Sequence, residues 1–217
     1  MSEITQIVLL TLRVCATSTI FSSIMAIPLG LLLGLYNNRT TQFFRPLFTA
    51  FTGLPPVIAG VVVYLIFSNN GTLGELKWLY TTKVIVIAQM LIVIPIIASN
   101  IFPAISPIRK DYWLTSKGLG LGKGKTLLQL IKEISSTIIA AVIAGFGRAI
   151  AEVGAVMMVG GNIRYKTRVM TSSIVLETNK GNYEMALKLG IILMIISISV
   201  SFLAMYFTKG ARRDSSK

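Results

Sequence analysis

Histidine is absent from this sequence of 217 residues, and Cys15 is its one cysteine. These absences exclude a zinc site of the His-Glu-x-x-His type, a cluster of cysteine ligands and a disulfide framework. Acidic residues are also few, eight in all, and only Glu152 falls inside an apolar stretch. The paired carboxylates or metal cage of a membrane hydrolase or transferase cannot be assembled from this set. We therefore expect no catalytic and no metal-binding residues in the chain.

Charge of either sign is scarce, because 13% of the residues are charged while 53% are hydrophobic, and the mean hydropathy is +0.74. This composition is too apolar for an ordinary water-soluble domain of the same length. The net charge of +13 would suggest a nucleic-acid partner in another context, but no basic face interleaved with aromatic residues is present. Basic residues at the ends of membrane spans explain the charge instead. The sequence predicts a membrane protein that binds the lipid bilayer and no nucleic acid.

Five apolar stretches are long enough for helices that cross a bilayer, which needs about 20 residues per span. They cover residues 7–35, 47–67, 83–105, 137–160 and 185–208. They predict an all-α integral membrane protein of about five transmembrane helices, forming one domain over residues 1–217. The first stretch continues past any plausible processing point, so we expect no cleavable signal peptide.

Local patterns predict how some helices pack, bend and end. In the first stretch, small residues recur every fourth position and predict a face for close helix packing; they are Ser18, Ser22, Ala26, Gly30 and Gly34. Pro55 and Pro56 must bend or break the second stretch, either as a packing kink or on a permeation path. Ser106 and Pro107 predict a helix start, and Asn182 predicts the cap of the last helix.

Basic residues are more numerous in the segments on one side of the five predicted spans. This bias places the amino terminus outside and the carboxyl terminus in the cytoplasm. The cluster of Arg164, Lys166 and Arg168 works against the bias. It is either an ordinary solvated loop or a surface that faces an anion.

Arg148 and Glu152 lie four residues apart in the fourth stretch, so one helical face would carry both. Charges at membrane depth are expensive and should pair within the bundle or line a water-filled cavity. Two interpretations follow. The pair either neutralises itself and fixes helix packing, or it lines a translocation path in which Arg148 attracts an anion.

Residues 106–136 form a basic, glycine-rich loop between the third and fourth stretches. Gly124-Lys125-Thr126 copies the end of a phosphate-binding loop, but that motif requires glycine where Leu119 stands, so we expect no nucleotide site. Two short helices, from Asp111 to Gly118 and from Gly124 to Ser136, would place large apolar side chains among basic ones. Such a surface is typical of a partner interface, and the alternative is an amphipathic hairpin lying on the membrane. The candidate contact residues are Trp113, Leu114, Gly118, Gly120, Leu121 and Leu127.

Several motifs resemble those of the tungstate importer permeases, which are membrane subunits of ABC importers. They are Gly53-Leu-Pro-Pro-Val57, Ile87-Ala-Gln89, Ile94-Pro-Ile96 and the run from Gly145 to Ile163. ABC permeases also share a loop motif, Glu-Ala-Ala, three residues, then glycine. With that glycine placed on Gly120, the chain departs from the triad at Leu114-Thr115-Ser116 and from the later Leu-Pro at Lys132-Glu133.

The resemblance implies a type I ABC importer permease fold in the inner membrane of a prokaryotic cell. It implies a homodimer of permeases, cytoplasmic ABC ATPases docked on residues 106–136 around Gly120, and an extracytoplasmic binding protein that delivers an oxyanion. ATP and magnesium would be bound by the partner ATPase, with no cofactor in this chain. The path candidates are Arg148, Glu152, Gly160, Gly161 and Asn162, where backbone donors near the glycines would meet a tetrahedral oxyanion. The alternatives are a permease for molybdate, sulfate or another substrate and, in a different class, a secondary transporter or channel.

Overall fold

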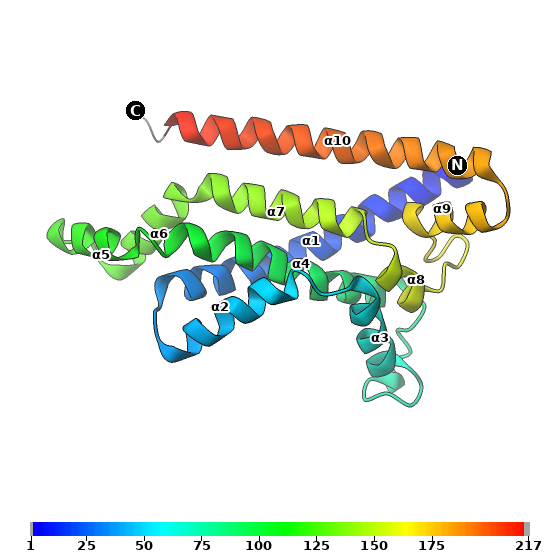
Figure 1. The fold of residues 1–217 in the computed structure, drawn as a ribbon, viewed down its shortest axis with the longest axis horizontal. Helices are drawn as coiled ribbons and strands as arrows, with labels where there is room; N and C mark the ends of the chain where they lie inside the picture. The colour runs from blue at the N-terminus through cyan, green and yellow to red at the C-terminus, as the bar shows by residue number, and fades with distance from the viewer. Residues whose placement is uncertain (1, 215–217) are drawn as a thin grey trace.

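The computed structural model describes residues 2–214, with side chains described up to residue 203. All secondary-structure elements in this part of the chain are helices and none is a strand, which confirms the predicted fold class (Figure 1). The elements are α1 (Glu3–Leu35), α2 (Arg39–Phe51), α3 (Pro56–Phe67), the 3₁₀ helix η1 (Gly74–Leu76), α4 (Thr82–Ile105), α5 (Arg109–Gly118), α6 (Lys123–Glu133), α7 (Ser135–Ile150), α8 (Gly154–Gly160), α9 (Met170–Asn179) and α10 (Tyr183–Asp214).

Three helices, α1, α4 and α10, are long and apolar enough to cross a membrane by themselves. Two bent pairs raise the number of candidate spans to five: α2 with α3, bent by 105°, and α6 with α7, bent by 61°. α1 and α7 both pack on α4, and α10 runs along α7 (Figure 1). The α5–α6 hairpin (residues 106–136) lies at one end of the bundle, the hairpin end, and α9 lies with the start of α1 at the other, the α9 end. The prediction of five spans therefore agrees with the upper limit of five crossings, in which each bent pair counts as one span.

The small-residue face of α1 packs against α4, as predicted. Ser18, Ser22 and Ala26 are completely buried along it. A Cβ atom added at Gly30 would lie 2.8 Å from Ile101 Cβ, and one added at Gly34 would lie 2.7 Å from Ile105 Cβ. Two helix backbones approach this closely only where one of them lacks side chains.

Substituting Gly30 therefore tests this packing. We expect Gly30→Ala to lower the free energy of unfolding by about 1–3 kcal/mol, because the added methyl group overpacks the contact with Ile101. Gly190→Ala in α10 is the matched control, since no heavy atom lies within 4 Å of its added Cβ. Thermal unfolding in detergent should separate the two variants, and equal melting temperatures would contradict the packing.

The two adjacent prolines break the second predicted span. After α2 ends at Phe51, the chain resumes as a helix at Pro56, the first residue of α3. Proline fits a first helical position because it has no N–H to donate, and two adjacent prolines would leave a continuous helix without two consecutive N–H donors. The predicted bend is thus confirmed.

The fourth stretch is not the single helix predicted over residues 137–160. Its first helix, α7, ends at Ile150, and a second, α8, begins at Gly154. Glu152 causes part of this break, because its Oε1 accepts the Ala155 N–H at 3.1 Å and so caps α8. Gly154 permits the close approach, since a Cβ there would lie 2.8 Å from Val57 Cγ2.

Helix ends around the α5–α6 hairpin also differ in part from the prediction. Ser106 ends α4 rather than starting a helix, and its hydroxyl donates to the Phe102 carbonyl at 3.0 Å. The next residue is proline, which cannot extend the helical hydrogen bonds of α4. The second hairpin helix ends at Glu133 rather than Ser136, because the chain bends there into α7. At the other end of the bundle Asn182 caps α10 as predicted, accepting the Met185 N–H at 3.4 Å.

Candidate functional site

The breaks in the second and fourth spans lie against each other. α3 and α8 both begin at these breaks, and they pack on each other through small residues. A Cβ atom at Gly60 would lie 2.8 Å from Ala155 Cα, and Gly154 contacts Val57 directly. Interrupted helices leave backbone groups without helical partners, which is tolerated at membrane depth only within protein or beside a wet cavity. The meeting point of the two breaks is therefore the first candidate site.

Arg148 and Glu152 lie at this meeting point and form an ion pair. Arg148 Nη1 is 2.8 Å from Glu152 Oε2, and the Glu152 side chain is only 2% exposed. Both carboxylate oxygens are in use, since Oε1 caps α8. The Arg148 side chain remains 31% exposed, and within residues 2–203 its guanidinium has no partner other than Glu152. A guanidinium has five N–H donors, so Arg148 keeps donors for a ligand.

Two polar residues that sequence reasoning did not assign also hold this region. Gln89 of α4 donates from Nε2 to the Ala149 carbonyl at 3.1 Å, while its buried Oε1 has no partner among the described residues. Thr171 of α9 donates from Oγ1 to the Glu152 carbonyl at 2.8 Å. A buried amide within the apolar α4 was the signal for Gln89. Thr171 gave no such signal, because it is ordinary for its local sequence.

The turn at Gly160, Gly161 and Asn162 lies on the far side of the seven-residue α8 from Glu152. Gly161 and Asn162 have φ angles of 66° and 50°, which reverse the chain after α8. The turn uses its donors internally, because the Gly161 N–H bonds to the Met157 carbonyl at 3.1 Å and the Ile163 N–H bonds to Thr167 Oγ1 at 2.9 Å. The turn thus lies at the opposite end of α8 from Glu152, the partner of Arg148.

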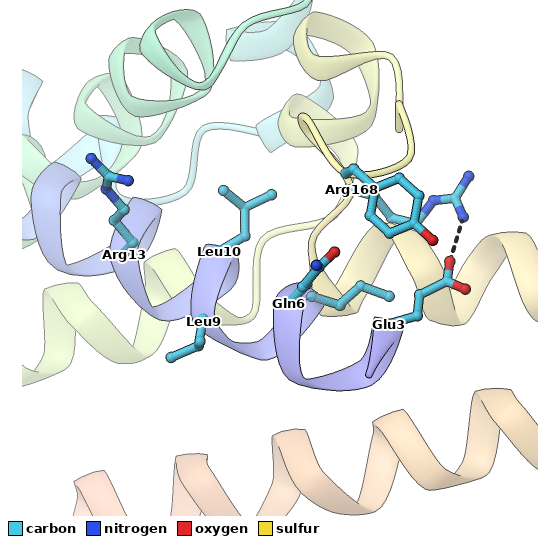
Figure 2. A pocket seen from close by; sticks show the side chains of 8 residues that line it. Glu3, Gln6, Leu9, Leu10, Arg13 and Arg168 are labelled. Carbon is cyan, nitrogen blue, oxygen red and sulfur yellow. Dashed lines mark hydrogen bonds and ion pairs between the residues drawn. The ribbon is translucent and has the colours of Figure 1, made fainter. Parts of the chain in front are cut away.

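The basic cluster at the α9 end is partly neutralised by Glu3. Arg164 Nη2 lies 2.6 Å from Glu3 Oε2, and Arg168 Nη1 lies 3.4 Å from Glu3 Oε1. Figure 2 shows Arg168 beside Glu3, lining a cavity of about 360 Å³, with Arg13 on the other side of Leu10. Arg164 and Arg168 therefore tie the start of α1 to the loop before α9, whereas Lys166 remains exposed.

The α5–α6 hairpin carries the predicted partner-contact residues on a tight turn. Gly120 has a φ angle of 66°, and the Leu121 N–H closes the turn on the Ser116 carbonyl at 2.9 Å. Added Cβ atoms at Gly118 and Gly120 would meet no atom within 4 Å, so the turn faces open space. Burial and the nearby Glu133 carboxylate raise the pKa of Tyr112, a residue of α5.

Large apolar side chains are exposed on this hairpin. Trp113 is 37% exposed, Leu114 69% and Leu127 38%. Leu119 and Leu128, which sequence reasoning did not single out, are 70% and 56% exposed. Leu130 is buried and anchors α6 to the bundle. Apolar surface concentrated beside basic residues is typical of an interaction site.

Known proteins that resemble this chain are transport proteins. Residues 26–213 match the family described as "Binding-protein-dependent transport system inner membrane component". The tungstate uptake system permease protein TupB of Peptoclostridium acidaminophilum is 35% identical over 199 residues, covering 92% of this chain and 87% of the relative. TupB of Campylobacter jejuni is 32% identical, covering 77% and 70%, and a probable anion ABC transporter permease of Haloferax volcanii is 28% identical, covering 95% and 91%.

The family match covers most of the chain, and the helices, the broken spans and the exposed hairpin fit an ABC permease. The chain therefore belongs to the family of inner membrane components of binding-protein-dependent transport systems, the permease subunits of ABC importers.

Proposed function

We propose that this permease translocates tungstate, or a similar tetrahedral oxyanion, by alternating access driven by a partner ATPase. The observation that carries the proposal is the partly exposed Arg148 at the meeting point of two broken spans. Similarity to two permeases named for tungstate uptake supports the choice of anion. Glu152 occupies only part of the Arg148 guanidinium, and an anion in transit would accept hydrogen bonds from the remaining N–H donors.

Glu152 positions this charge rather than competing for the anion. Its carboxylate is buried, and its two oxygens are held by Arg148 and by the Ala155 N–H. The Arg148 guanidinium is therefore held at the meeting point of the two breaks, and its N–H donors that do not contact Glu152 remain available to an anion. In this account the Gly160–Asn162 turn holds α8 in place farther along the path.

The α5–α6 hairpin couples the conformational changes of the ATPase to the permease. Its exposed apolar side chains would dock a cytoplasmic ABC ATPase, which binds ATP and magnesium. At most five crossings enclose little space, so a second copy of the permease would supply the other wall of the path. An extracytoplasmic binding protein would deliver the anion at the α9 end, which places that end outside.

ATP hydrolysis in nanodiscs tests the substrate. The purified permease is combined with its partner ATPase and binding protein, and hydrolysis is measured with tungstate, molybdate or sulfate. We expect tungstate to stimulate hydrolysis at the lowest concentration, and binding protein without an anion serves as the control. Stimulation by sulfate or molybdate at lower concentrations than by tungstate would reassign the substrate, and no stimulation by any tetrahedral oxyanion would contradict the proposal.

A further inference from the structure

A groove between α1 and α4 at the α9 end remains outside the proposed transport path. Its volume is about 620 Å³, and most of its lining is apolar, including Val14, Phe21, Val86 and Met90. Arg13 of α1, Lys83 of α4 and Trp78 also line it. The groove thus combines a hydrocarbon-like wall with two cationic side chains.

The two cationic side chains lie at the same depth in the bundle. Gly30 packs on Ile101 and Gly34 on Ile105, so α1 and α4 run in parallel with a constant offset. The same offset places Arg13 level with the residue that follows Lys83. From Lys83 to Ile105 a helix rises about 33 Å at about 1.5 Å per residue, close to the ~30 Å hydrocarbon thickness of a bilayer. Arg13 and Lys83 therefore lie at a membrane surface, with the apolar lining extending toward the membrane interior.

Neither cation has an acidic partner. Arg13 and Lys83 take part in no ion pair within residues 2–203, and no acidic residue lines the groove. Figure 2 shows Leu10 between Arg13 and the Glu3–Arg168 pair, and within residues 2–203 Glu3 forms ion pairs with Arg164 and Arg168 but not with Arg13. The Lys83 ammonium lies 5.0 Å from the centre of the Trp78 ring. Tryptophan and basic residues together are typical of the headgroup level.

We propose that this groove binds one anionic phospholipid. Its phosphate lies between Arg13 and Lys83, beside the indole of Trp78, and one acyl chain runs along Val14, Phe21 and Met90. The groove supplies two positive charges and an apolar slot, which an anionic amphiphile complements and a zwitterionic lipid complements less well. This lipid site does not depend on which anion the permease carries.

Native mass spectrometry of the full chain in mild detergent tests the site. Phosphatidylglycerol and phosphatidylcholine are offered at equal concentrations, and the lipid retained per chain is counted. We expect the wild type to retain one phosphatidylglycerol. The double variant Arg13→Gln/Lys83→Gln should retain about thirtyfold less, the equivalent of about 2 kcal/mol at 1.4 kcal/mol per tenfold.

Matched variants separate headgroup binding from general charge. Arg39→Gln/Lys166→Gln removes two exposed positive charges elsewhere and should leave retention unchanged. Thr17→Trp fills the apolar slot and should reduce retention although both cations remain. Unchanged phosphatidylglycerol retention in the Arg13/Lys83 variant would overturn the proposal. A disulfide between two Phe21→Cys chains in native membranes would also overturn it, because a second copy would then cover the groove.

Discussion

Replacing Arg148 with Met will abolish anion transport and lower the free energy of unfolding by about 3–5 kcal/mol, the usual penalty when a buried carboxylate loses its partner. Glu152 is 2% exposed and cannot recover water when the guanidinium is gone. Equilibrium unfolding in mixed micelles and uptake into proteoliposomes measure the two effects separately.

The double variant Arg148→Met/Glu152→Gln decides between the two interpretations of this ion pair. It removes both charges, while the glutamine amide oxygen can still accept the Ala155 N–H that starts α8. We expect most of the lost stability to return and transport to remain absent, because the cation that meets the anion is missing. Recovery of transport together with stability would show that the pair serves packing alone.

Glu152→Gln by itself is the matched control. It frees the partly exposed Arg148 from its acidic partner while keeping the cap of α8. Transport should persist in this variant, because the positive charge on the path is retained.

Replacing Leu114 with Asp will weaken the binding of the ATPase to the permease and leave the permease folded. Leu114 is 69% exposed on α5, so the fold loses little apolar burial. A well-packed contact at the centre of an interface contributes about 2 kcal/mol or more, so the affinity for the ATPase should fall about thirtyfold. Co-purification of the ATPase with the detergent-solubilised permease measures this loss.

The control places the same new charge at the α9 end. Tyr165→Asp changes a side chain that is 65% exposed in the loop between α8 and α9, and Figure 1 shows these two helices far from the hairpin. The affinity of Tyr165→Asp for the ATPase should equal that of the wild type. Gly120→Leu adds a second test on the hairpin, although its φ of 66° also strains a leucine backbone. Wild-type ATPase binding by Leu114→Asp would count against the hairpin as the docking site.

Features set by local chemistry were predictable from the sequence. The period of small residues on α1 predicted its packing face, because helical spacing alone brings those positions together. Pro55 and Pro56 predicted the break between α2 and α3, since two adjacent prolines remove two consecutive backbone N–H donors, whereas the single prolines Pro28 and Pro95 lie inside α1 and α4. The glycine-rich hairpin and its apolar side chains likewise followed from residues close together in the chain.

Features set by distant contacts were not predictable. The break before α8 depends on Glu152 capping Ala155 and on Val57 lying against Gly154, and Val57 belongs to another span. The pairing of Glu3 with Arg164 joins two residues 161 positions apart in the chain, at the start of α1 and in the loop before α9, and no local pattern indicates it. Gln89 was visible as a polar residue in an apolar helix, but its target, the Ala149 carbonyl, was not.

Uphill accumulation of tungstate in proteoliposomes tests the central claim most directly, namely that this chain has no energy source of its own and is driven through its hairpin. Vesicles contain the permease with or without its ABC ATPase, receive binding protein outside and ATP inside, and are followed until uptake stops. We expect the internal concentration to exceed the external one only when ATPase and ATP are both present, and vanadate to prevent it. Accumulation against the gradient without the ATPase would contradict this account and identify a secondary transporter.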